Sequence, residues 1–441
     1  MSKVLILGAG LAGCEAALIL AKHNINVELI EMKPKKFTPA HHNPNFAELV
    51  CSNSLKSIGI ETATGLLKEE MKLLGSVTIE AANHTRVPAG NALAVNREHF
   101  SQYITKQIKE HPKIQIHTKE QVNLPATDYC IVATGPLTTP TLSNEIEELF
   151  GEENFKFFDA ASPIVTSESL DTSKIYFAAR YNKGEADYLN CPLTETEYND
   201  FQNALINAET ASLHDFEVPN FFFGCMPIEA MAKKGHQTLR FGPLKPVGIR
   251  NPQTNENAYA IVQLRKEDCN GNLFNLVGFQ TNLKWSEQKR VFGLIPGLKN
   301  AEFVRYGVMH RNTFINSPKI LDAYFRTKIR PTLFFAGQIT GVEGYLESAA
   351  SGIVAGLNLM KIIQRKRLVP LPQTTMIGAL AKYISSETKD FQPMNSNMGI
   401  LPPLKMNIKS KKEKYMALSN RAIKDLTNWD KECCHFNFTQ K

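Results

Sequence analysis

The first thirty residues alternate between apolar runs and small or polar positions in an order typical of a parallel sheet. The apolar run Lys3–Leu7 predicts a short buried strand, and Asn26–Ile30 predicts a second strand that ends at Glu31. Between them, an Ala- and Leu-rich segment predicts a helix over about Cys14–His23. Three glycines fill the turn before this helix: Gly8, Gly10 and Gly13. The chain therefore begins with a strand–helix–strand unit.

The glycine spacing predicts that this unit binds a dinucleotide. Gly8 suits a tight turn, Gly10 lets the backbone approach a pyrophosphate, and Gly13 lets the helix pack closely on the strand. The helix then directs unpaired N–H groups and a positive dipole end at the phosphates. Glu31 follows Gly13 by 18 residues, near the spacing expected for an acid that binds ribose hydroxyls. The alternative is a close-packed turn without a ligand.

Two later segments are predicted to join the same sheet. Asp128–Gly135 predicts a buried strand that ends in Ala133, Thr134 and Gly135. Thr332–Gly344 predicts a strand running into a glycine-rich loop, followed by a small-residue helix over Ser348–Leu359. This late return of strand, glycine turn and helix resembles FAD-binding oxidoreductase folds. Because no second glycine fingerprint appears, the pattern favours FAD over NAD as the tightly held cofactor.

The middle of the chain has a different pattern of apolar and polar residues. Glu197–Ala208 predicts an amphipathic helix, while Tyr259–Leu264 and Leu273–Phe279 alternate as strands do. We therefore predict an α/β protein in which a Rossmann-like FAD-binding domain of glutathione-reductase type carries an inserted α+β domain. The FAD-binding domain is predicted at residues 1–190 and 310–441, and the insertion at residues 191–309.

Composition narrows the class of protein. The chain has 441 residues, 43% hydrophobic and 21% charged, which excludes disorder as its main state. Apolar runs stay short of the roughly 18 residues that a membrane span needs, so a cytoplasmic protein without membrane association is expected. The eight cysteines form no CxxC pair, so neither a metal site nor a disulfide framework is expected.

The charge is unevenly distributed. The net charge is +7, but residues from Lys361 onward carry +9 and the remainder carries −2. This basic, helical C-terminal tail predicts a surface that faces a polyanion such as RNA, and the alternative is a solvated lysine-rich helix. Basic residues near aromatics in loops or in the tail are further RNA-binding candidates. They are Arg240, Lys245, Arg305, Arg311, Lys411 and Lys412.

Two cysteines have surroundings that suit a reactive thiol. Polar residues and Lys56 follow Cys51, and a helix that starts at about Pro227 follows Cys225. A nearby cation or a helix N-terminus favours the nucleophilic thiolate. The alternative for each is a packing role, which is expected for Cys14 in the first helix and Cys130 in a buried strand.

Long blocks of the chain, in order from Lys3 to about Pro403, resemble the folate- and FAD-dependent tRNA (uracil-5-)-methyltransferases. The blocks that carry the resemblance are FAELVCSNSLKS, YNKGEADYLNCPLTETEY, GCMPIEAMAKKG, TLRFGPLKPVG, LVGFQTNLKW, IPGLKNAEFVRYGVMHRNTFINSP and FFAGQITGVEGYLESAASG. The resemblance implies transfer of a carbon from 5,10-methylenetetrahydrofolate to C5 of a uridine. Reduced FAD would carry the carbon and donate electrons, with NADH or NADPH as the reductant.

The resemblance also implies roles for individual residues. Cys51 and Cys225 match two catalytic cysteines, and His310 matches a histidine that packs the pterin against the flavin. One thiolate would add to uracil C6, and a second group would remove the C5 proton. We favour Cys51 as the nucleophile and Cys225 as the acid/base, although the residue types alone allow the reverse. The implied FAD site comprises Gly8, Gly10, Gly13, Glu31, Gly337, Gln338, Gly341 and Glu343.

Four positions depart from the usual pattern of that family. Asn91 and Asn96 occupy positions where the family usually has Gly and Asp. Phe223 replaces a usual acidic residue, and Gly293 replaces a usual basic residue. The expected target is the T-loop of tRNA, and the alternative is a 23S rRNA uridine modified by a paralogue. A flavin oxidoreductase acting on a small molecule and a catalytically silent RNA-binding paralogue are the alternatives from other classes. No oligomeric state is predicted.

Overall fold

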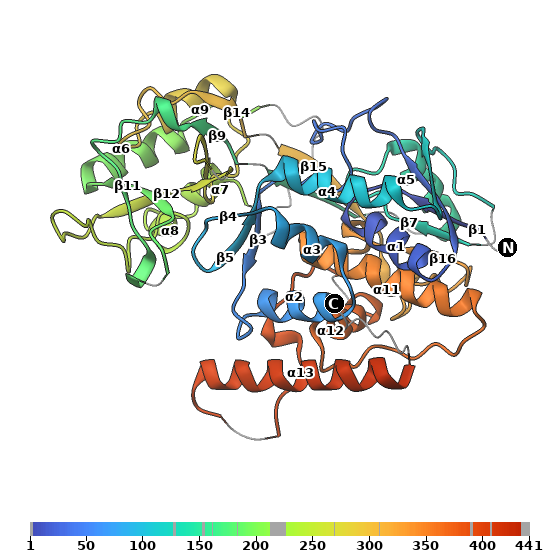
Figure 1. Cartoon of the computed structure of the whole chain (residues 1–441). Coiled ribbons are helices and arrows are strands. Elements are labelled where there is room, and N and C mark those ends of the chain that lie inside the picture. Colours follow the sequence, from blue (N-terminus) through green and yellow to red (C-terminus); the bar gives the residue numbers. More distant parts are fainter. Residues whose placement is uncertain are drawn as a thin grey trace.

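A five-stranded parallel sheet lies at the centre of the larger lobe of the molecule (Figure 1). Its strands lie in the order β16-β7-β1-β2-β6. They are β1 (Lys3–Leu7), β2 (Asn26–Glu31), β6 (Ile114–Thr118), β7 (Cys130–Val132) and β16 (Leu333–Phe335). Strands β7 and β16 are apolar and buried along their whole length, and Val4–Leu7 of β1 is buried as well, as expected where helices cover both faces of a parallel sheet. This arrangement confirms the predicted α/β class.

The structure is a computed structural model, and it describes most of the chain. The described residues are 3–126, 129–151, 155–160, 162–182, 184–211, 226–268, 270–307, 309–388, 391–405 and 408–433. For residues 155–160 and 309–311 the structure describes the backbone and not the side chains.

Two helices pack closely because small residues line their contact. In α11 (Tyr345–Ile363), a Cβ on Gly352 would lie 2.2 Å from the Ala12 carbonyl oxygen of α1 (Leu11–Lys22). A Cβ on Gly356 would lie 3.1 Å from the Ala16 Cα. Helix α11 is long and apolar enough to cross a membrane, but 83% of that apolar stretch is buried inside the protein. The close crossing brings the N-termini of both helices to one edge of the sheet.

Further elements complete the larger lobe. A small antiparallel sheet has the order β3-β5-β4, formed by β3 (Ser54–Ser57), β4 (Arg86–Val87) and β5 (Ala92–Val95). The larger helices around the two sheets are α2 (Ala63–Leu73), α3 (Val77–His84), α4 (Arg97–Glu110), α5 (Pro140–Phe150) and α12 (Met376–Ser385). A short helix, α10 (Ser317–Ile320), packs on α12.

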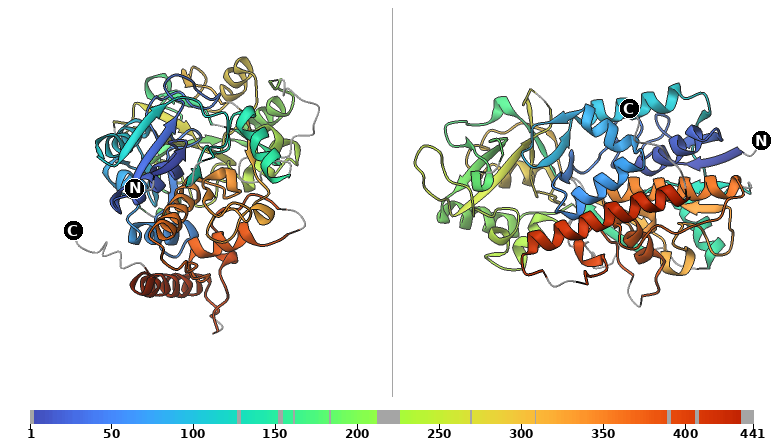
Figure 2. Two further views of the ribbon diagram at one scale, coloured as in Figure 1. Left: turned by 90° about the vertical axis from the view of Figure 1, so that its right-hand side faces the viewer. Right: turned by 60° about the horizontal axis from the view of Figure 1, so that its bottom comes forward.

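The C-terminal tail forms the helix α13 (Lys411–Cys433), which lies along the outside of this lobe (Figure 2). Its apolar side packs against α2 through residues such as Leu418 and Leu426. Lys361 of α11 is buried, with its Nζ 4.5 Å from the centre of the Trp429 ring. This cation–π contact fastens the end of α13 to the core.

The second lobe is a six-stranded antiparallel sheet with helices (Figure 1). The strand order is β10-β11-β12-β13-β9-β14. The strands are β9 (Ile164–Thr166), β10 (Tyr176–Phe177), β11 (Tyr188–Leu193), β12 (Ala260–Lys266), β13 (Leu273–Leu276) and β14 (Phe303–Arg305). The helices are α6 (Glu195–Ile206), α7 (Ile228–Lys233), α8 (Thr238–Phe241) and α9 (Trp285–Phe292). This lobe matches the predicted α+β character of the insertion.

The antiparallel sheet of the second lobe includes strands that precede residue 191, the predicted start of the insertion. Two antiparallel strands, β8 (Phe155–Ala160) and β15 (Met309–Phe314), lead the chain into and out of the second lobe. The predicted start at residue 191 falls inside β11, whereas β9 and β10 already pair with the insertion strands. We therefore propose that the insertion spans residues 162–307. Strands of two and three residues are too short for their periodicity to be detected in the sequence.

A buried carboxyl group on α2 makes the stability of this fold depend on pH. Glu70 accepts hydrogen bonds from the N–H groups of Met376 (2.7 Å) and Ile377 (2.9 Å) at the start of α12. Burial nevertheless raises the pKa of Glu70 to about 8. The folded protein therefore keeps this proton up to about pH 8, whereas an unfolded chain releases it near pH 4.3.

We expect the contribution of Glu70 to stability to be fully present at low pH and lost as the pH rises toward 8. Between pH 5 and pH 8.5, the wild type should lose at least about 1 kcal/mol of unfolding free energy relative to Glu70→Gln. Urea unfolding of both proteins across this range measures the difference. Parallel pH profiles for the two proteins would contradict the prediction.

Candidate active site

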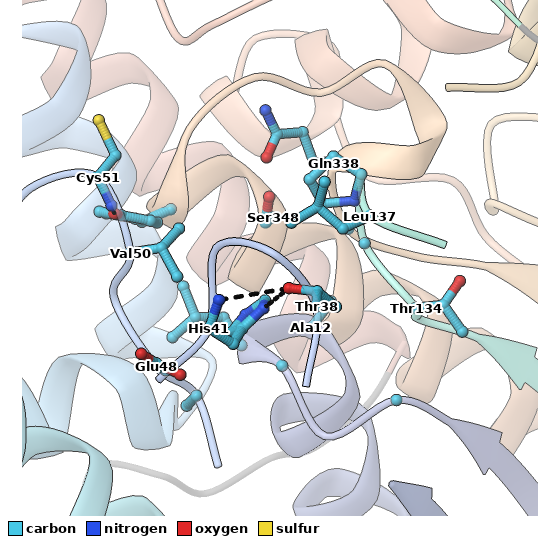
Figure 3. Close-up of a pocket in the computed structure, with 18 of the residues that line it drawn as sticks. Ala12, Thr38, His41, Glu48, Val50, Cys51, Thr134, Leu137, Gln338 and Ser348 are labelled. Atoms are coloured by element: carbon cyan, nitrogen blue, oxygen red, sulfur yellow. Dashed lines mark hydrogen bonds between the residues drawn. The ribbon is translucent and has the colours of Figure 1, made fainter. Parts of the chain in front are cut away.

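A cavity of about 470 Å³ lies between the carboxyl ends of the parallel strands and the inserted lobe. Open α/β sheets bind their ligands at this edge. In the view of Figure 3, Cys51 lies on one side of the cavity and Thr134 on the other, with Gln338 and Ser348 between them. The insertion contributes Arg265, Asn275, Val277, Gly278 and Gln280 to the lining. Both lobes therefore form the site.

The glycine turn forms one wall of this cavity. Gly8 has φ +94°, and a Cβ there would lie 2.6 Å from the Ala133 carbonyl oxygen. A Cβ on Gly13 would lie 1.9 Å from the Gly8 carbonyl oxygen. Gly10 is different, because its backbone is extended and no described atom lies within 4 Å of its Cβ position. Gly8 and Gly13 therefore shape the turn, while Gly10 leaves room for a ligand.

Glu31 lies beside this turn at the end of β2. Its Oε2 accepts a hydrogen bond from the Ala9 N–H (2.8 Å), and its Oε1 accepts one from the Lys33 N–H (2.9 Å). Each carboxylate oxygen has a second lone pair, and Glu31 lines the cavity. The carboxylate can therefore hold the turn in shape and still accept a hydrogen bond from a ribose hydroxyl.

The loop between β16 and α11 forms the opposite wall. The Gly337 N–H donates to Ser351 Oγ (2.6 Å), and Gln338 Nε2 donates to Glu343 Oε2 (2.6 Å). Helix α11 begins after Gly344 without a side-chain cap, so its first N–H groups face the cavity lining. Two helix N-termini, a glycine cradle and a carboxylate thus surround one cavity, and these residues fit a dinucleotide.

The predicted cofactor residues divide into two groups. Those that line the cavity are Gly8, Gly10, Glu31, Ala133, Thr134, Gly135, Gly337, Gln338 and Glu343. Gly13 and Gly341 are not among the lining residues and pack against other parts of the protein. A Cβ on Gly341, which has φ +81°, would lie 2.6 Å from the Phe391 ring. These two glycines therefore act through packing, and the binding roles of the others stay predictions.

Backbone hydrogen bonds fix the position of Cys51 at this cavity. The Tyr345 hydroxyl, at the first residue of α11, accepts hydrogen bonds from the N–H groups of Cys51 (2.6 Å) and Ser52 (3.1 Å). Burial raises the pKa of Tyr345, so this hydroxyl stays neutral. Arg97 of α4 donates to the Val50 carbonyl (3.3 Å) on the other side of the thiol. The sequence does not single out Tyr345 or Arg97, because their roles depend on long-range contacts.

The inserted lobe holds the same loop. Arg265 of β12 donates to Ser52 Oγ (2.7 Å) and to Asn53 Oδ1 (2.8 Å). Glu267, just beyond the same strand, pairs with Arg97 through two contacts of 2.8 and 3.1 Å. The position of Cys51 therefore depends on the docking of the two lobes.

Two arginines lie near enough to Cys51 to interact with it. The guanidinium groups of Arg97 and Arg305 both interact electrostatically with this thiol. Nearby cations favour a thiolate over a thiol. By contrast, burial raises the pKa of Cys130 to about 12 and raises that of Cys14 well above its usual value. Cys14 and Cys130 therefore stay neutral thiols within the core, as a packing role requires.

Cys225 lies outside the described residues, as does Phe223. The described chain resumes at Met226, and the Ile228 N–H donates to the carbonyl of Gln280 (2.8 Å), which lines the cavity. His310 lies on β15 and its side chain is outside the description. Asn312, two residues further along β15, lines the cavity. The roles of Cys225 and His310 stay predictions.

The RNA-binding candidates differ in their contacts with the rest of the protein. Arg240 lies 3.6 Å from the centre of the Tyr259 ring and donates to its carbonyl oxygen (2.8 Å). Arg305 donates to the Val50 carbonyl beside Cys51. Lys245 is exposed on the inserted lobe. Arg240 and Arg305 therefore have contacts within the protein that the sequence does not reveal.

The remaining candidates are Lys411, Lys412 and Arg311. Lys411 and Lys412 are exposed at the start of α13, the helix on the outside of the larger lobe (Figure 2). The side chain of Arg311 lies outside the description. RNA binding by Arg240, Lys245, Arg305, Arg311, Lys411 and Lys412 stays a prediction, because no contact in the structure tests it.

The fold and the cavity define an α/β protein built to hold a dinucleotide under an inserted lobe. The family model described as "Glucose inhibited division protein A" matches residues 3–367, and the chain belongs to this family. Within it, the chain is 56% identical over 419 residues to the "Methylenetetrahydrofolate--tRNA-(uracil-5-)-methyltransferase TrmFO" of Listeria monocytogenes, which covers 95% of this chain and 96% of that protein. The protein of the same name from Desulfitobacterium hafniense is 56% identical over 427 residues, covering 97% and 98%.

A solved structure supports the fold independently. Aquifex aeolicus GidA matches with a TM-score of 0.69, covering 98% of this chain and 73% of that one. At 17% identity this match concerns the fold alone. Together with the curated relatives, the comparison confirms both the predicted family and the predicted fold class.

Proposed function

We propose that this protein is a methylenetetrahydrofolate- and FAD-dependent tRNA (uracil-5-)-methyltransferase. It transfers one carbon from 5,10-methylenetetrahydrofolate to C5 of a uridine and forms 5-methyluridine. The observation that carries the proposal is the position of Cys51, which residues of both lobes hold at the dinucleotide cavity. The near-full-length identity to curated enzymes of this name supports the same activity.

The cavity lining indicates which residues would hold FAD. The glycine turn and the start of α11 would face the pyrophosphate, Glu31 would accept hydrogen bonds from the ribose, and Gln338 lines the same cavity. Bound FAD would supply the carrier for the transferred carbon and its reducing electrons. NADH or NADPH is the proposed reductant.

The two thiols would make C5 of the uridine reactive toward the transferred carbon. Uracil C5 is a poor nucleophile until a thiolate adds to C6, which places electron density on C5. After the carbon is attached, a base removes the C5 proton and the first thiolate leaves C6. We propose Cys51 as the thiolate, because two guanidinium groups lie near it, and Cys225 as the acid/base.

Chain connectivity supports the participation of Cys225. Ile228 is hydrogen-bonded to Gln280 at the cavity, and Cys225 is three residues from Ile228. Residues two apart on a strand share a face, so position 310 shares the face of Asn312. This supports the proposed contact of His310 with the pterin.

We propose tRNA, and specifically its T-loop, as the target rather than 23S rRNA. The curated relatives are named as tRNA enzymes. The departures at described positions, Asn91, Asn96 and Gly293, are not among the residues that line the cavity. Asn96 caps α4 by accepting from the His99 N–H, and Gly293 ends α9. A target uridine must leave its base stack to reach the cavity, which favours a loop nucleotide.

A direct assay tests this proposal. Purified protein is incubated with FAD, NADH or NADPH, labelled 5,10-methylenetetrahydrofolate, and either tRNA transcript or a 23S rRNA fragment. We expect label in 5-methyluridine from the tRNA. Label in the rRNA alone would show that the target is 23S rRNA rather than tRNA. Flavin turnover on small molecules without any RNA product would overturn the proposal. Mapping 5-methyluridine in both RNA pools of a deletion strain provides the cellular test.

A further inference from the structure

One buried amide at the cavity lacks a hydrogen-bond partner. Asn275 of β13 is 2% exposed, it lines the cavity, and its Nδ2 has no partner among the described residues. Leaving a buried amide donor unpaired costs about 1–3 kcal/mol, so native proteins rarely retain one without a reason. We therefore expect the partner of this amide to be the ligand that the cavity binds.

The strand pairing determines the direction of this side chain. Phe274 and Leu276, on either side of Asn275, belong to the apolar core of the inserted lobe. Because alternate residues on a strand point to opposite faces, Asn275 points to the other face, toward the cavity. Its neighbour on β12 is Arg265, the residue that donates to the loop of Cys51. Asn275 therefore lies on the part of the sheet that covers the reacting end of the cavity.

The other polar residues on this face have partners in the protein. Gln263 donates to Asn190 Oδ1 (3.0 Å) and accepts from Arg180 (3.3 Å). The guanidinium of Arg265 donates hydrogen bonds to Ser52 and Asn53. Asn275 alone among these three side chains, Gln263, Arg265 and Asn275, keeps both its donor and its acceptor available. This singles out Asn275 for contact with a ligand.

We propose that Asn275 binds the lactam edge of the ring that is held in this cavity. A carboxamide presents a donor and an acceptor in one plane, and an adjacent carbonyl and ring N–H complement it with two hydrogen bonds. Uracil, the pterin of the folate and the flavin ring all carry such an edge, at N3–H and C4=O, and the flavin content of the variants shows whether the flavin uses this contact. The inference rests on the proposed function, and it assigns Asn275 a part in choosing which ring is accepted.

The test compares Asn275→Leu, which keeps the side-chain volume and removes both polar atoms, with Gln263→Leu on the same sheet face. Binding of tetrahydrofolate and of a T-arm hairpin to the FAD-loaded proteins is measured by calorimetry, alongside steady-state kinetics. We expect Asn275→Leu to weaken one of the two ligands about ten-fold, with flavin content unchanged. Gln263→Leu should lower thermal stability and leave both affinities within about two-fold.

The ligand that responds identifies the ring. Weaker tetrahydrofolate binding with normal hairpin binding assigns the contact to the pterin, and the opposite result assigns it to uracil. Unchanged affinity for both ligands, or equal losses in the two leucine variants, would overturn the proposal. Asn275→Ser serves as a second variant in case leucine prevents folding. If the wild type transfers no carbon to RNA, the proposed function fails, but the calorimetry still tests the role of Asn275.

Discussion

Replacement of Cys51 by alanine is expected to abolish carbon transfer while FAD stays bound. The guanidinium groups of Arg97 and Arg305 interact electrostatically with this thiol, which lies in a loop that Tyr345 fixes through two backbone N–H groups. An alanine can neither add to C6 of the uridine nor remove its C5 proton. We expect the rate to fall by at least about 10³-fold, the range found when such a group is removed.

The same loss is expected for Cys225→Ala, because addition to C6 and removal of the C5 proton are both required for turnover. Flavin absorbance and single-turnover formation of 5-methyluridine measure cofactor retention and chemistry separately. Cys433→Ala is the matched control, since this cysteine is the last residue of α13 and is not among the residues that line the cavity. Normal turnover of either Cys51→Ala or Cys225→Ala would remove the two-thiol mechanism.

A substrate analogue separates the two thiol roles. When the uridine carries fluorine at C5, a thiolate can still add to C6, but no C5 proton is available for removal. The covalent complex should therefore accumulate in the wild type and in Cys225→Ala, and it should be absent in Cys51→Ala. The reverse pattern on a denaturing gel would exchange the two assignments while leaving the chemistry in place.

The contacts around Cys51 explain why the two lobes must act together. Arg97 belongs to the FAD-binding lobe and pairs with Glu267 of the insertion, while Arg265 of the insertion holds Ser52 and Asn53. A small shift of the insertion would therefore move the thiol relative to the cavity. Positioning of reacting groups accounts for a large part of catalysis, so this docking is part of the active site.

Local sequence patterns predict the parts of this molecule that local physics determines. The strand at Lys3–Leu7 and the glycine turn follow from apolar periodicity and from the need for residues without a Cβ. The strand at Cys130–Val132 was likewise identifiable as an uninterrupted apolar run. The packing role of Cys14 and Cys130 also agrees with their burial.

Long-range contacts set the limits of such prediction. Arg305 was predicted to bind RNA because it is basic and lies near aromatic residues, but its guanidinium donates to a carbonyl 255 positions earlier in the chain. Tyr345 contacts Cys51 across 294 positions. Asn275 has no distinctive local pattern, and only the pairing of β13 shows which side of the sheet it occupies. These residues became identifiable only once the sheet order was known.

A pair of glycine-to-alanine substitutions is expected to separate the fold of the dinucleotide turn from its ligand. In Gly13→Ala the added methyl would lie 1.9 Å from the Gly8 carbonyl oxygen, a backbone atom that cannot rotate away. Alanine normally favours a helix over glycine by about 1 kcal/mol, but this clash outweighs that gain and forces α1 away from the turn. We expect Gly13→Ala to lose thermal stability and to purify without FAD.

Gly10→Ala should behave differently. The backbone at Gly10 is extended, which alanine adopts freely, and no described atom lies within 4 Å of the new methyl. The FAD-free protein should therefore keep its melting temperature. The methyl would instead occupy the cavity where the pyrophosphate approaches the helix, which should weaken FAD binding about 10²-fold, equivalent to about 3 kcal/mol. Equal FAD content in Gly10→Ala and the wild type, measured by flavin absorbance, would show that the pyrophosphate lies elsewhere.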